Sequence, residues 1–354
     1  MKREIFVGGV GIGGRHPVSL QSMTNTPAAD AGATLDQIRL LQADGCQIVR
    51  VAVPDMACIE AFKKITSAAG LPVIADIHFD ARLALEAIDA GAGGIRINPG
   101  NIGSKEKLKE ILRLANQKKI PIRIGVNYGS IEKKYRPRNG RSISRAEAMV
   151  QSLMDWLKFF EDRDFFNIKV SAKSSAVRET VAAYRLIDRQ CDYPLHVGIT
   201  EAGTLLSGTV KSAVGIGALL LDGIGNTIRV SLTADPREEV RVGKAILQAL
   251  GLRKEGIEII SCPTCSRTSV DLIPLVEAVE KRLAALKPAK KITVAVMGCE
   301  VNGPGEAADA DIGVAFSQHH GFLFHKGRML EKLPPKKALA RLVELIQNLM
   351  ETRE

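Results

Sequence analysis

The chain has 354 residues, of which 45% are hydrophobic, 25% charged and 4% aromatic, a composition typical of a globular protein rather than a disordered one. It has no run of about 18 uncharged apolar residues and no long apolar stretch near its N-terminus, so we expect no membrane span and no secretory signal. Its formal net charge of +10 favours an anionic partner.

The basic residues are spread along the chain, and no aromatic-interleaved RNA-binding motif appears. We therefore expect a phosphorylated small molecule as the partner, and no nucleic acid. The six cysteines, with no signal peptide before them, indicate reduced thiols and a cytoplasmic protein rather than a disulfide framework.

In chain order, the first fifteen residues are predicted to form a hairpin at the edge of a barrel. Short apolar runs then alternate with segments of helical period as far as residue 251. The predicted strands are 18–23, 47–53, 72–77, 93–98, 121–127, 166–172, 195–200 and 227–232. The predicted helices are 34–44, 57–69, 80–90, 104–118, 144–161, 174–190, 207–222 and 236–250, with Ser104 and Ser144 as N-caps.

Eight strands, each followed by a helix, predict a parallel sheet. Eight repeats favour closure into a (β/α)8 TIM-like barrel over residues 1–251 rather than an open doubly wound sheet. Gly9, Gly11 and Gly14 match the spacing of a dinucleotide fingerprint. However, a turn and a strand follow them instead of a helix, so the match does not indicate a nicotinamide site.

After residue 251 the pattern changes to a smaller α+β domain over residues 252–354, with LRKEG (252–256) as the joint. Strands are predicted at GIEIISCP, KITVAVMG and DIGVAFS, a helix at 270–286, a hairpin at GFLFHKGRML and a closing helix at the C-terminus.

Polar residues gather where the predicted barrel strands end, which is where TIM barrels place their active sites. One or two charged or polar residues, most of them cations, occur on strand after strand: Arg50, Asp76 and His78, Arg96 and Asn98, Arg123 and Asn127, Lys169 and Lys173, Arg229 and Ser231. Each could be a structural ion pair, but too few acids lie at the same ends to pair them all. Because arginine suits bidentate phosphate contact, the sequence predicts a densely anionic small substrate such as a diphosphate. Glu201 is an acid in this basic set, either a salt-bridge partner or a group for proton transfer.

The second domain carries a cysteine cluster. Cys262 and Cys265 have the C-x-x-C spacing, and Cys299 follows a later strand. Three interpretations remain open: a redox dithiol, a zinc site completed by His319, His320 or His325, and a [4Fe–4S] cluster. In the third, the tight NGPG turn brings Glu306 back beside Cys299 as a fourth, replaceable ligand.

Four stretches resemble the 4-hydroxy-3-methylbut-2-en-1-yl diphosphate synthase family: CPTCSRT, MGCEVNGPGEA, VGGVGIGGRHPVSLQSMTNT and RVSLTADP. The resemblance covers essentially the whole chain. Ser266 stands where the family often has glycine, which leaves every ligand in place. No large insertion separates the two domains, so the chain looks like the two-domain bacterial form.

The resemblance implies an iron–sulfur oxidoreductase of isoprenoid precursor biosynthesis. It would open and dehydrate 2-C-methyl-D-erythritol 2,4-cyclodiphosphate reductively, with electrons from flavodoxin or ferredoxin. One [4Fe–4S] cluster per chain would be held by Cys262, Cys265, Cys299 and Glu306, with Glu306 yielding to a substrate oxygen.

By the same resemblance, Glu201 would lie near the reacting carbons. The implied substrate-binding residues are Arg50, Arg96, Arg123, Asn127, Lys173, Arg229 and Ser231. The family also implies a head-to-tail homodimer, in which the cluster domain of one subunit lies on the barrel of the other. The alternative from another class is a zinc-stabilised barrel that binds a phosphorylated ligand without redox chemistry.

Overall fold

The computed structural model describes residues 1–102, 104–136, 143–283, 286, 288–299, 307 and 309–351. The chain divides into two compact units, Met1–Leu252 and Arg253–Glu354. Among the described residues, no helix is both long enough and apolar enough to span a bilayer.

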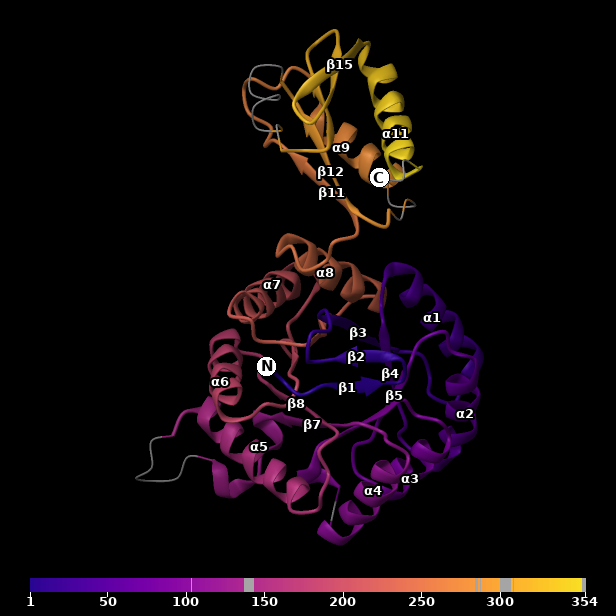
Figure 1. The fold of residues 1–354 in the computed structure, drawn as a ribbon, viewed down its shortest axis with the longest axis vertical. Coiled ribbons are helices and arrows are strands. Elements are labelled where there is room, and N and C mark those ends of the chain that lie inside the picture. The colour runs from indigo at the N-terminus through magenta and orange to yellow at the C-terminus, as the bar shows by residue number, and fades with distance from the viewer. Residues whose placement is uncertain are drawn as a thin grey trace. The chain divides into compact units, whose positions relative to one another are not determined.

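The first unit is a barrel of eight parallel strands inside a ring of helices (Figure 1). Neighbouring strands follow the order β8-β7-β6-β5-β4-β3-β10-β9, and a bridge between Val170 and Leu195 joins β8 to the strand that leads into β9. This arrangement confirms the predicted (β/α)8 barrel. The strands are β3 (Ser19–Met23), β4 (Ile48–Ala52), β5 (Val73–Asp76), β6 (Gly94–Ile97), β7 (Ile122–Asn127), β8 (Ile168–Lys173), β9 (His196–Val197) and β10 (Thr227–Ile228).

The helices around the barrel begin at side chains that cap them, as the sequence indicated. Ser104 Oγ accepts the Lys107 N–H at 3.3 Å, and Ser144 forms a capping box with Glu147. The first helix begins earlier than the predicted residue 34, because Asp30 caps it by accepting the Ala33 N–H at 2.9 Å. The helices are α1 (Ala31–Asp44), α2 (Ile59–Ala68), α3 (Ala81–Asp89), α4 (Lys105–Gln117), α5 (Arg145–Glu161), α6 (Val177–Gln190), α7 (Leu205–Leu221) and α8 (Pro236–Ala249).

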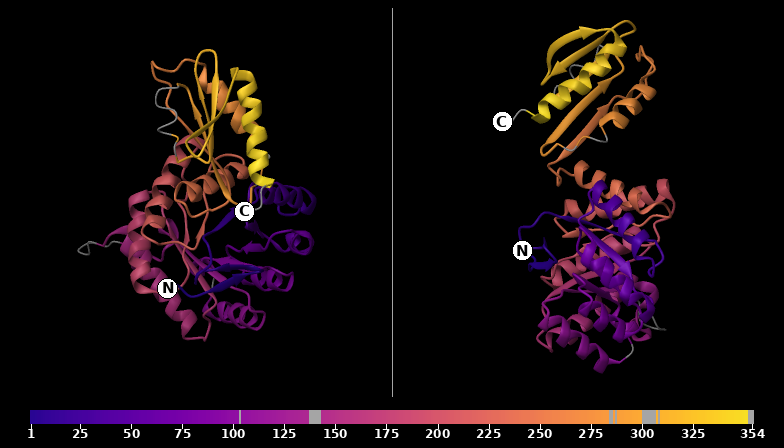
Figure 2. Two further views of the ribbon diagram at one scale, coloured as in Figure 1. Left: turned by 45° about the horizontal axis from the view of Figure 1, so that its top comes forward. Right: turned by 90° about the vertical axis from the view of Figure 1, so that its right-hand side faces the viewer.

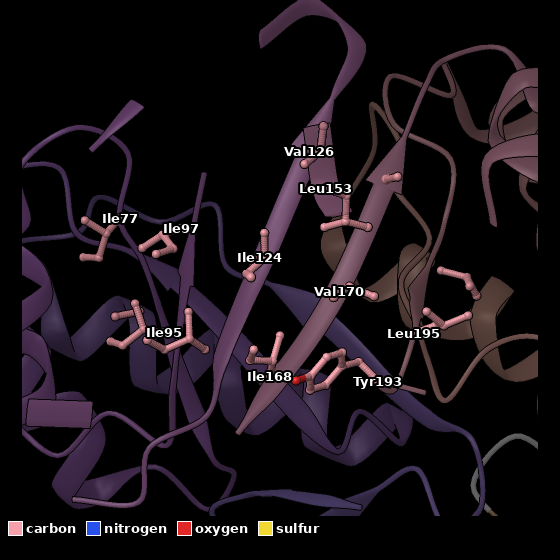
Figure 3. Packing of buried hydrophobic residues seen from close by; sticks show 14 of the residues in the cluster. Ile77, Ile95, Ile97, Ile124, Val126, Leu153, Ile168, Val170, Tyr193 and Leu195 are labelled. Carbon is pink, nitrogen blue, oxygen red and sulfur yellow. The ribbon is translucent and has the colours of Figure 1, made fainter. Parts of the chain in front are cut away.

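Alternation along each strand separates the apolar core from the barrel interior. On β4, Val49 and Val51 belong to the core shared with the helices, whereas Arg50 between them faces the other side of the sheet. The same alternation continues on the neighbouring strands. Figure 3 shows the resulting apolar layer, with Ile95 and Ile97 on β6, Ile124 and Val126 on β7, and Ile168 and Val170 on β8.

An N-terminal hairpin closes one end of the barrel, as predicted. It consists of the antiparallel strands β1 (Ile5–Val7) and β2 (Val10–Ile12). Ile5, Val7 and Ile12 form a buried cluster with Ile48 and Ile74, which lie at the start of β4 and near the start of β5. The hairpin therefore covers the end where the strands begin and leaves their carboxyl ends free.

The last two barrel strands are shorter than predicted. Regular pairing covers two residues in each of β9 and β10, where the sequence indicated 195–200 and 227–232. The Arg229 N–H still donates to the Val197 carbonyl of β9 at 3.1 Å, but the Leu232 N–H donates to Glu239 Oε1 on α8 at 3.0 Å instead of to a neighbouring strand. Arg229 and Ser231 consequently lie on an irregular segment rather than on a strand.

The second unit is a five-stranded sheet in the order β11-β12-β13-β14-β15, of which the first three strands are parallel. The helices α9 (Leu272–Leu283) and α11 (Pro335–Glu351) pack against each other and share a buried cluster with this sheet. Figure 2 shows α11 lying along the sheet. The strands are β11 (Gly256–Ser261), β12 (Lys291–Met297), β13 (Ile312–Phe316), β14 (Gly321–His325) and β15 (Arg328–Leu333).

The hairpin seal leads to a first prediction. Ile12→Ala removes a fully buried side chain from the closed end, so the free energy of unfolding should fall by about 2–5 kcal/mol. Leu40→Ala, on the exposed side of α1, should lower it by less than about 1 kcal/mol. Urea unfolding followed by circular dichroism measures both. Equal effects in the two variants would show that the hairpin does not contribute to the barrel core.

Candidate functional site

The barrel interior gathers cations from four of its eight strands. Five buried basic side chains lie there, and Arg229 follows β10 close to them. The buried set is Arg50 on β4, Arg96 on β6, Arg123 on β7, and Lys169 and Lys173 on β8. The sequence spread these residues over four strands, and the structure brings them into one interior.

One carboxylate, Asp76 at the end of β5, stands among these cations. Its Oδ1 lies 3.0 Å from Arg96 Nη1, and its Oδ2 lies 3.4 Å from Arg50 Nε and 3.5 Å from His78 Nε2. Arg50 also directs Nε and Nη2 at the sulfur of Met23, at 3.2 and 2.8 Å. Asp76 therefore fixes the positions of two of the guanidinium groups.

The pKa values of these groups follow from burial and from their neighbours. Burial opposes the ionisation of Asp76, but Arg50, His78 and Arg96 outweigh it and hold the pKa of this carboxyl well below its usual range. Burial, together with the nearby Arg229 and Arg96, lowers the pKa of Arg50 to about 9, so Arg50 remains charged at neutral pH.

Burial and the surrounding cations also lower the pKa values of Arg123, Lys169 and Lys173. Among the described residues, several of their nitrogens have no hydrogen-bond partner: Arg96 Nε, Arg123 Nε and Nη1, Lys169 Nζ and Arg229 Nε. A buried polar atom without a partner costs about 1–3 kcal/mol, and a charged one costs more. An anion in the interior would remove much of this cost.

Glycines make room for the cations. A Cβ on Gly198, just after β9, would lie 2.8 Å from Lys173 Nζ, and one on Gly125 in β7 would lie 3.3 Å from Arg96 Nε. Any larger residue at Gly198 would push against the ammonium group or against the backbone. The two glycines thus let long basic side chains fill the space that ordinary side chains would occupy.

A pocket of about 300 Å³ opens where β7, β8 and β9 end. Asn127, Lys173, Thr200 and Glu201 are among the residues that line it. Glu201 is exposed and adopts a positive φ of 51°, a strained conformation for a residue other than glycine. The structure thus places the acid that the sequence singled out beside Asn127 and Lys173.

The remaining predicted residues lie after β10. Glu239 on α8 organises this segment: its Oε2 is 3.4 Å from Arg229 Nη2 and accepts the Ser22 hydroxyl at 3.3 Å, while its Oε1 accepts the Leu232 N–H. Ser231 is half-buried in the same segment.

Sequence reasoning assigned no role to two buried interior residues, Gln21 and His196, and it counted Lys169 among the strand cations without placing it in the substrate-binding set. Lys169 lies four residues before Lys173 and therefore on the same face of β8. Gln21 stands between the polar residues Ser19 and Ser22 on β3, and alternation alone could have placed both Gln21 and His196 on the inner face.

The three cysteines of the second unit come from two loops that follow the carboxyl ends of the parallel strands β11 and β12. Cys262 follows β11, Cys299 lies just beyond β12, and these strands are parallel with Ser261 opposite Val296. The Gly298 N–H donates to Cys262 Sγ at 3.2 Å, and the Ser269 N–H donates to the Gly298 carbonyl at 3.0 Å. The two loops are therefore held together directly.

Cys265 is exposed, and the backbone N–H of Arg267 lowers the pKa of its thiol, which favours the thiolate. Three sulfur donors at one edge suit a metal that prefers sulfur, such as iron in an iron–sulfur cluster or zinc. Within the described part of the chain, however, no three His, Cys, Asp or Glu side chains come close enough to hold a metal ion. Glu306, the predicted fourth ligand, lies outside the described residues.

The histidines considered for a zinc site lie at opposite ends of the strands of this sheet. His319 and His320 follow β13, which is parallel to β12, so they lie at the same edge of the sheet as the cysteines. His325 ends β14, which is antiparallel, and lies at the opposite edge. His325 is therefore excluded as a ligand of the cysteine cluster.

The arrangement around Asp76 leads to a second prediction. Asp76→Asn keeps the shape of the side chain but removes the negative charge between Arg50 and Arg96, so the free energy of unfolding at pH 7 should fall by about 3–5 kcal/mol. The matched variant Asp80→Asn breaks an exposed pair with Arg82 and should cost less than about 1 kcal/mol. Chemical denaturation measures both, and a loss below 1 kcal/mol for Asp76→Asn would contradict its role in holding the cations.

Comparison with known proteins agrees with this two-part construction. The model of the GcpE TIM-barrel domain matches residues 2–244, and that of the GcpE protein C-terminal domain matches residues 258–348. The chain is 53% identical over 348 residues to a 4-hydroxy-3-methylbut-2-en-1-yl diphosphate synthase (flavodoxin) of Geobacter sulfurreducens, covering 98% of each protein. It is 52% identical over 347 residues to the protein of the same name from Clostridium acetobutylicum, again covering 98% of each. The chain therefore belongs to the GcpE family.

Proposed function

We propose that this chain is an iron–sulfur oxidoreductase of isoprenoid precursor biosynthesis, a 4-hydroxy-3-methylbut-2-en-1-yl diphosphate synthase. It opens the ring of 2-C-methyl-D-erythritol 2,4-cyclodiphosphate to give (E)-4-hydroxy-3-methylbut-2-enyl diphosphate. Two electrons and two protons are consumed for each ring opened, and one water leaves. The observation that carries the proposal is the cationic barrel interior in a chain more than half identical to synthases of this name.

The cations bind and orient the cyclic diphosphate. Arg50 and Arg96 are held in place by Asp76 before the ligand arrives, so little side-chain entropy is lost on binding. Arg123 and Arg229 offer nitrogens without a partner among the described residues. Asn127, Lys173 and Ser231 complete the set at the ends of the strands. Because the interior is buried, each ion pair with phosphate is stronger there than in water.

Glu201 lies at the rim of this interior, in the pocket with Lys173 and Asn127. In this position it acts on the part of the substrate that projects from the barrel, as a group that accepts or donates a proton. Its positive φ holds its side chain at the mouth instead of letting the loop continue as a strand.

Cys262, Cys265 and Cys299 hold a [4Fe–4S] cluster, one per chain, with Glu306 as the fourth ligand. The cluster supplies single electrons received from a flavodoxin, which the names of the relatives specify, or a ferredoxin. The Gly298 N–H that bonds to Cys262 Sγ is the kind of contact that tunes the potential of such a group. None of the six cysteines is joined in a disulfide, which suits a reducing cytoplasm.

The active form is a homodimer in which the barrel of one subunit works with the cluster domain of the other. A surface for a second copy exists on α7, where Leu206 and Leu221 are 79% and 77% exposed and Val210 and Val214 lie between them. These side chains recur at helical spacing along one stripe. Lys211 is the one charged residue of α7, so two copies of a protein with a net charge of +10 can approach here with little repulsion.

The proposed chemistry leads to a third prediction. Protein purified without oxygen should be brown and contain about four irons and four sulfides per chain. With reduced flavodoxin it should convert the cyclodiphosphate to the linear allylic diphosphate. Glu306→Ala should retain part of its iron and lose nearly all turnover. Colourless protein with one zinc per chain would refute the redox function and favour a zinc-stabilised ligand-binding barrel.

The dimer leads to a fourth prediction, tested by complementation. Arg96→Ala impairs the barrel and Cys299→Ser impairs the cluster domain, so each variant alone should be inactive. Mixing equal amounts of the two with subunit exchange should restore activity, up to about a quarter of the wild-type rate, because about half of the dimers are mixed and one of the two sites in each mixed dimer is intact. Adding Leu206→Glu to both chains should abolish the restoration, and gel filtration should show monomers. No restoration despite demonstrated exchange would refute the shared site.

A further inference from the structure

Toward the closed end of the barrel interior, three polar side chains form what we call the barrel floor: Gln21 on β3, opposite Ile48, Lys169 on β8, opposite Arg123, and His196 on β9. They are 1%, 2% and 0% exposed, respectively. Their neighbours Leu20, Val170 and Val197 belong to the core shared with the helices, so alternation turns the floor residues toward the barrel axis. They thus share the interior with the cations.

The polar atoms of the floor have no protein partner within the described part of the chain. This holds for both side-chain atoms of Gln21, both ring nitrogens of His196 and Lys169 Nζ. Protein interiors rarely leave so many polar groups unsatisfied in one place. Something other than protein must satisfy them.

The hairpin determines from which side a ligand reaches the floor. Ile5, Val7 and Ile12 close the barrel where the strands begin, against Ile48 and Ile74. A ligand of the floor therefore enters from the end where the strands finish, past the arginines. Lys169 lies four residues before Lys173 on β8, about 13 Å further from that mouth measured between Cα atoms. The long side chain of Lys169 can span part of this distance.

The charges around the floor determine the sign of its ligand. Burial, Arg123 and Arg50 lower the pKa of Lys169, and burial, Lys173 and Arg123 lower the pKa of His196, so the charged groups around the floor are positive. Among the described residues, the two buried carboxylates already have partners, because Asp76 contacts Arg50 and Arg96 and Glu239 contacts Arg229. Water alone would satisfy the hydrogen bonds but would leave the positive charge uncompensated. An anion satisfies both.

We propose that the barrel floor of Gln21, Lys169 and His196 binds the phosphate group of the substrate that enters deepest. The floor thereby makes the site selective for a diphosphate, because only a ligand with two phosphate groups can contact the floor and the arginines nearer the mouth at the same time. This inference rests on the proposed function and adds three positioning and specificity residues to its site.

The surroundings of the amine also affect its proton equilibrium. Burial and the nearby guanidinium groups lower the pKa of Lys169 in the ligand-free protein. A phosphate beside the amine raises its pKa again. Binding therefore takes up protons, and the contribution of Lys169 to affinity should grow as the pH falls toward neutrality.

Titration calorimetry on the full chain with inorganic pyrophosphate tests the proposal, using buffers of different ionisation enthalpy. Lys169→Met keeps the length of the side chain without its amine. Binding should weaken at least about 20-fold, and the proton uptake per pyrophosphate should fall by up to about one relative to wild type. Comparing the two proteins in the same buffers cancels the protons that pyrophosphate itself takes up. Inorganic phosphate should bind both proteins alike.

The same variant separates a ligand-binding role from a structural one. Removing an unpaired buried amine should leave the melting temperature of the ligand-free protein unchanged or raise it, whereas the loss of a structural contact would lower it. Unchanged affinity and unchanged proton uptake in Lys169→Met would show that the floor is only hydrated, and would overturn the proposal. Should Lys169→Met fail to fold, Gln21→Met gives the answer: binding weakened several-fold with proton uptake retained supports the floor, and unchanged binding refutes it.

The variant Arg96→Gln distinguishes a failure of the floor proposal from a failure of the proposed function. If Arg96→Gln abolishes pyrophosphate binding and Lys169→Met does not weaken it, the barrel is the diphosphate site but the floor takes no part. If Arg96→Gln binds as wild type does, the barrel interior is not the diphosphate site, and both the floor and the proposed substrate site are wrong.

Discussion

The constraint on which this structure depends is an excess of positive charge inside a closed barrel. Arg50, Arg96, Arg123, Lys169 and Lys173 are buried together, and among the described residues Asp76 is the one carboxylate that contacts two of them. In a low-dielectric interior such charges repel strongly. An ordinary barrel fills this space with branched apolar side chains, which are more stable there. The loss of this stability is explained if a strongly anionic ligand binds in the interior and compensates the charge.

Other features of the barrel follow from the same requirement. The hairpin closes the end of the barrel where the strands begin, so solvent reaches the cations from the end where the strands finish. Gly125 and Gly198 leave room for the basic side chains. The segment after β10 departs from regular pairing and bonds to Glu239 on α8, which also holds Arg229. In the second unit, parallel strands deliver three cysteines to a single edge. Both units thus use the carboxyl ends of parallel strands to present reactive groups.

Much of this could be predicted from the sequence. Eight apolar runs with helical segments between them determined the barrel, and the caps at Ser104 and Ser144 were recognisable from local chemistry. The inward cations were visible because basic residues are costly within strands unless they serve a purpose. The early ends of β9 and β10 could not be predicted, because they depend on the tertiary contact between Leu232 and Glu239. The roles of Gln21 and His196 were missed for a similar reason, since a glutamine or a histidine on a predicted strand gains significance only once the strands close around one axis.

The measurement that tests the central claim most directly is the melting temperature of the barrel as a function of pyrophosphate concentration, with sodium chloride at matched ionic strength as the reference. If the interior cations lack compensation until an anion binds, pyrophosphate at about 100 times its dissociation constant should stabilise the folded state by about 2.7 kcal/mol and raise the melting temperature by about 5–10 °C. Chloride should raise it little. A melting temperature that responds equally to both salts, or to neither, would contradict the claim that the barrel is built around a diphosphate.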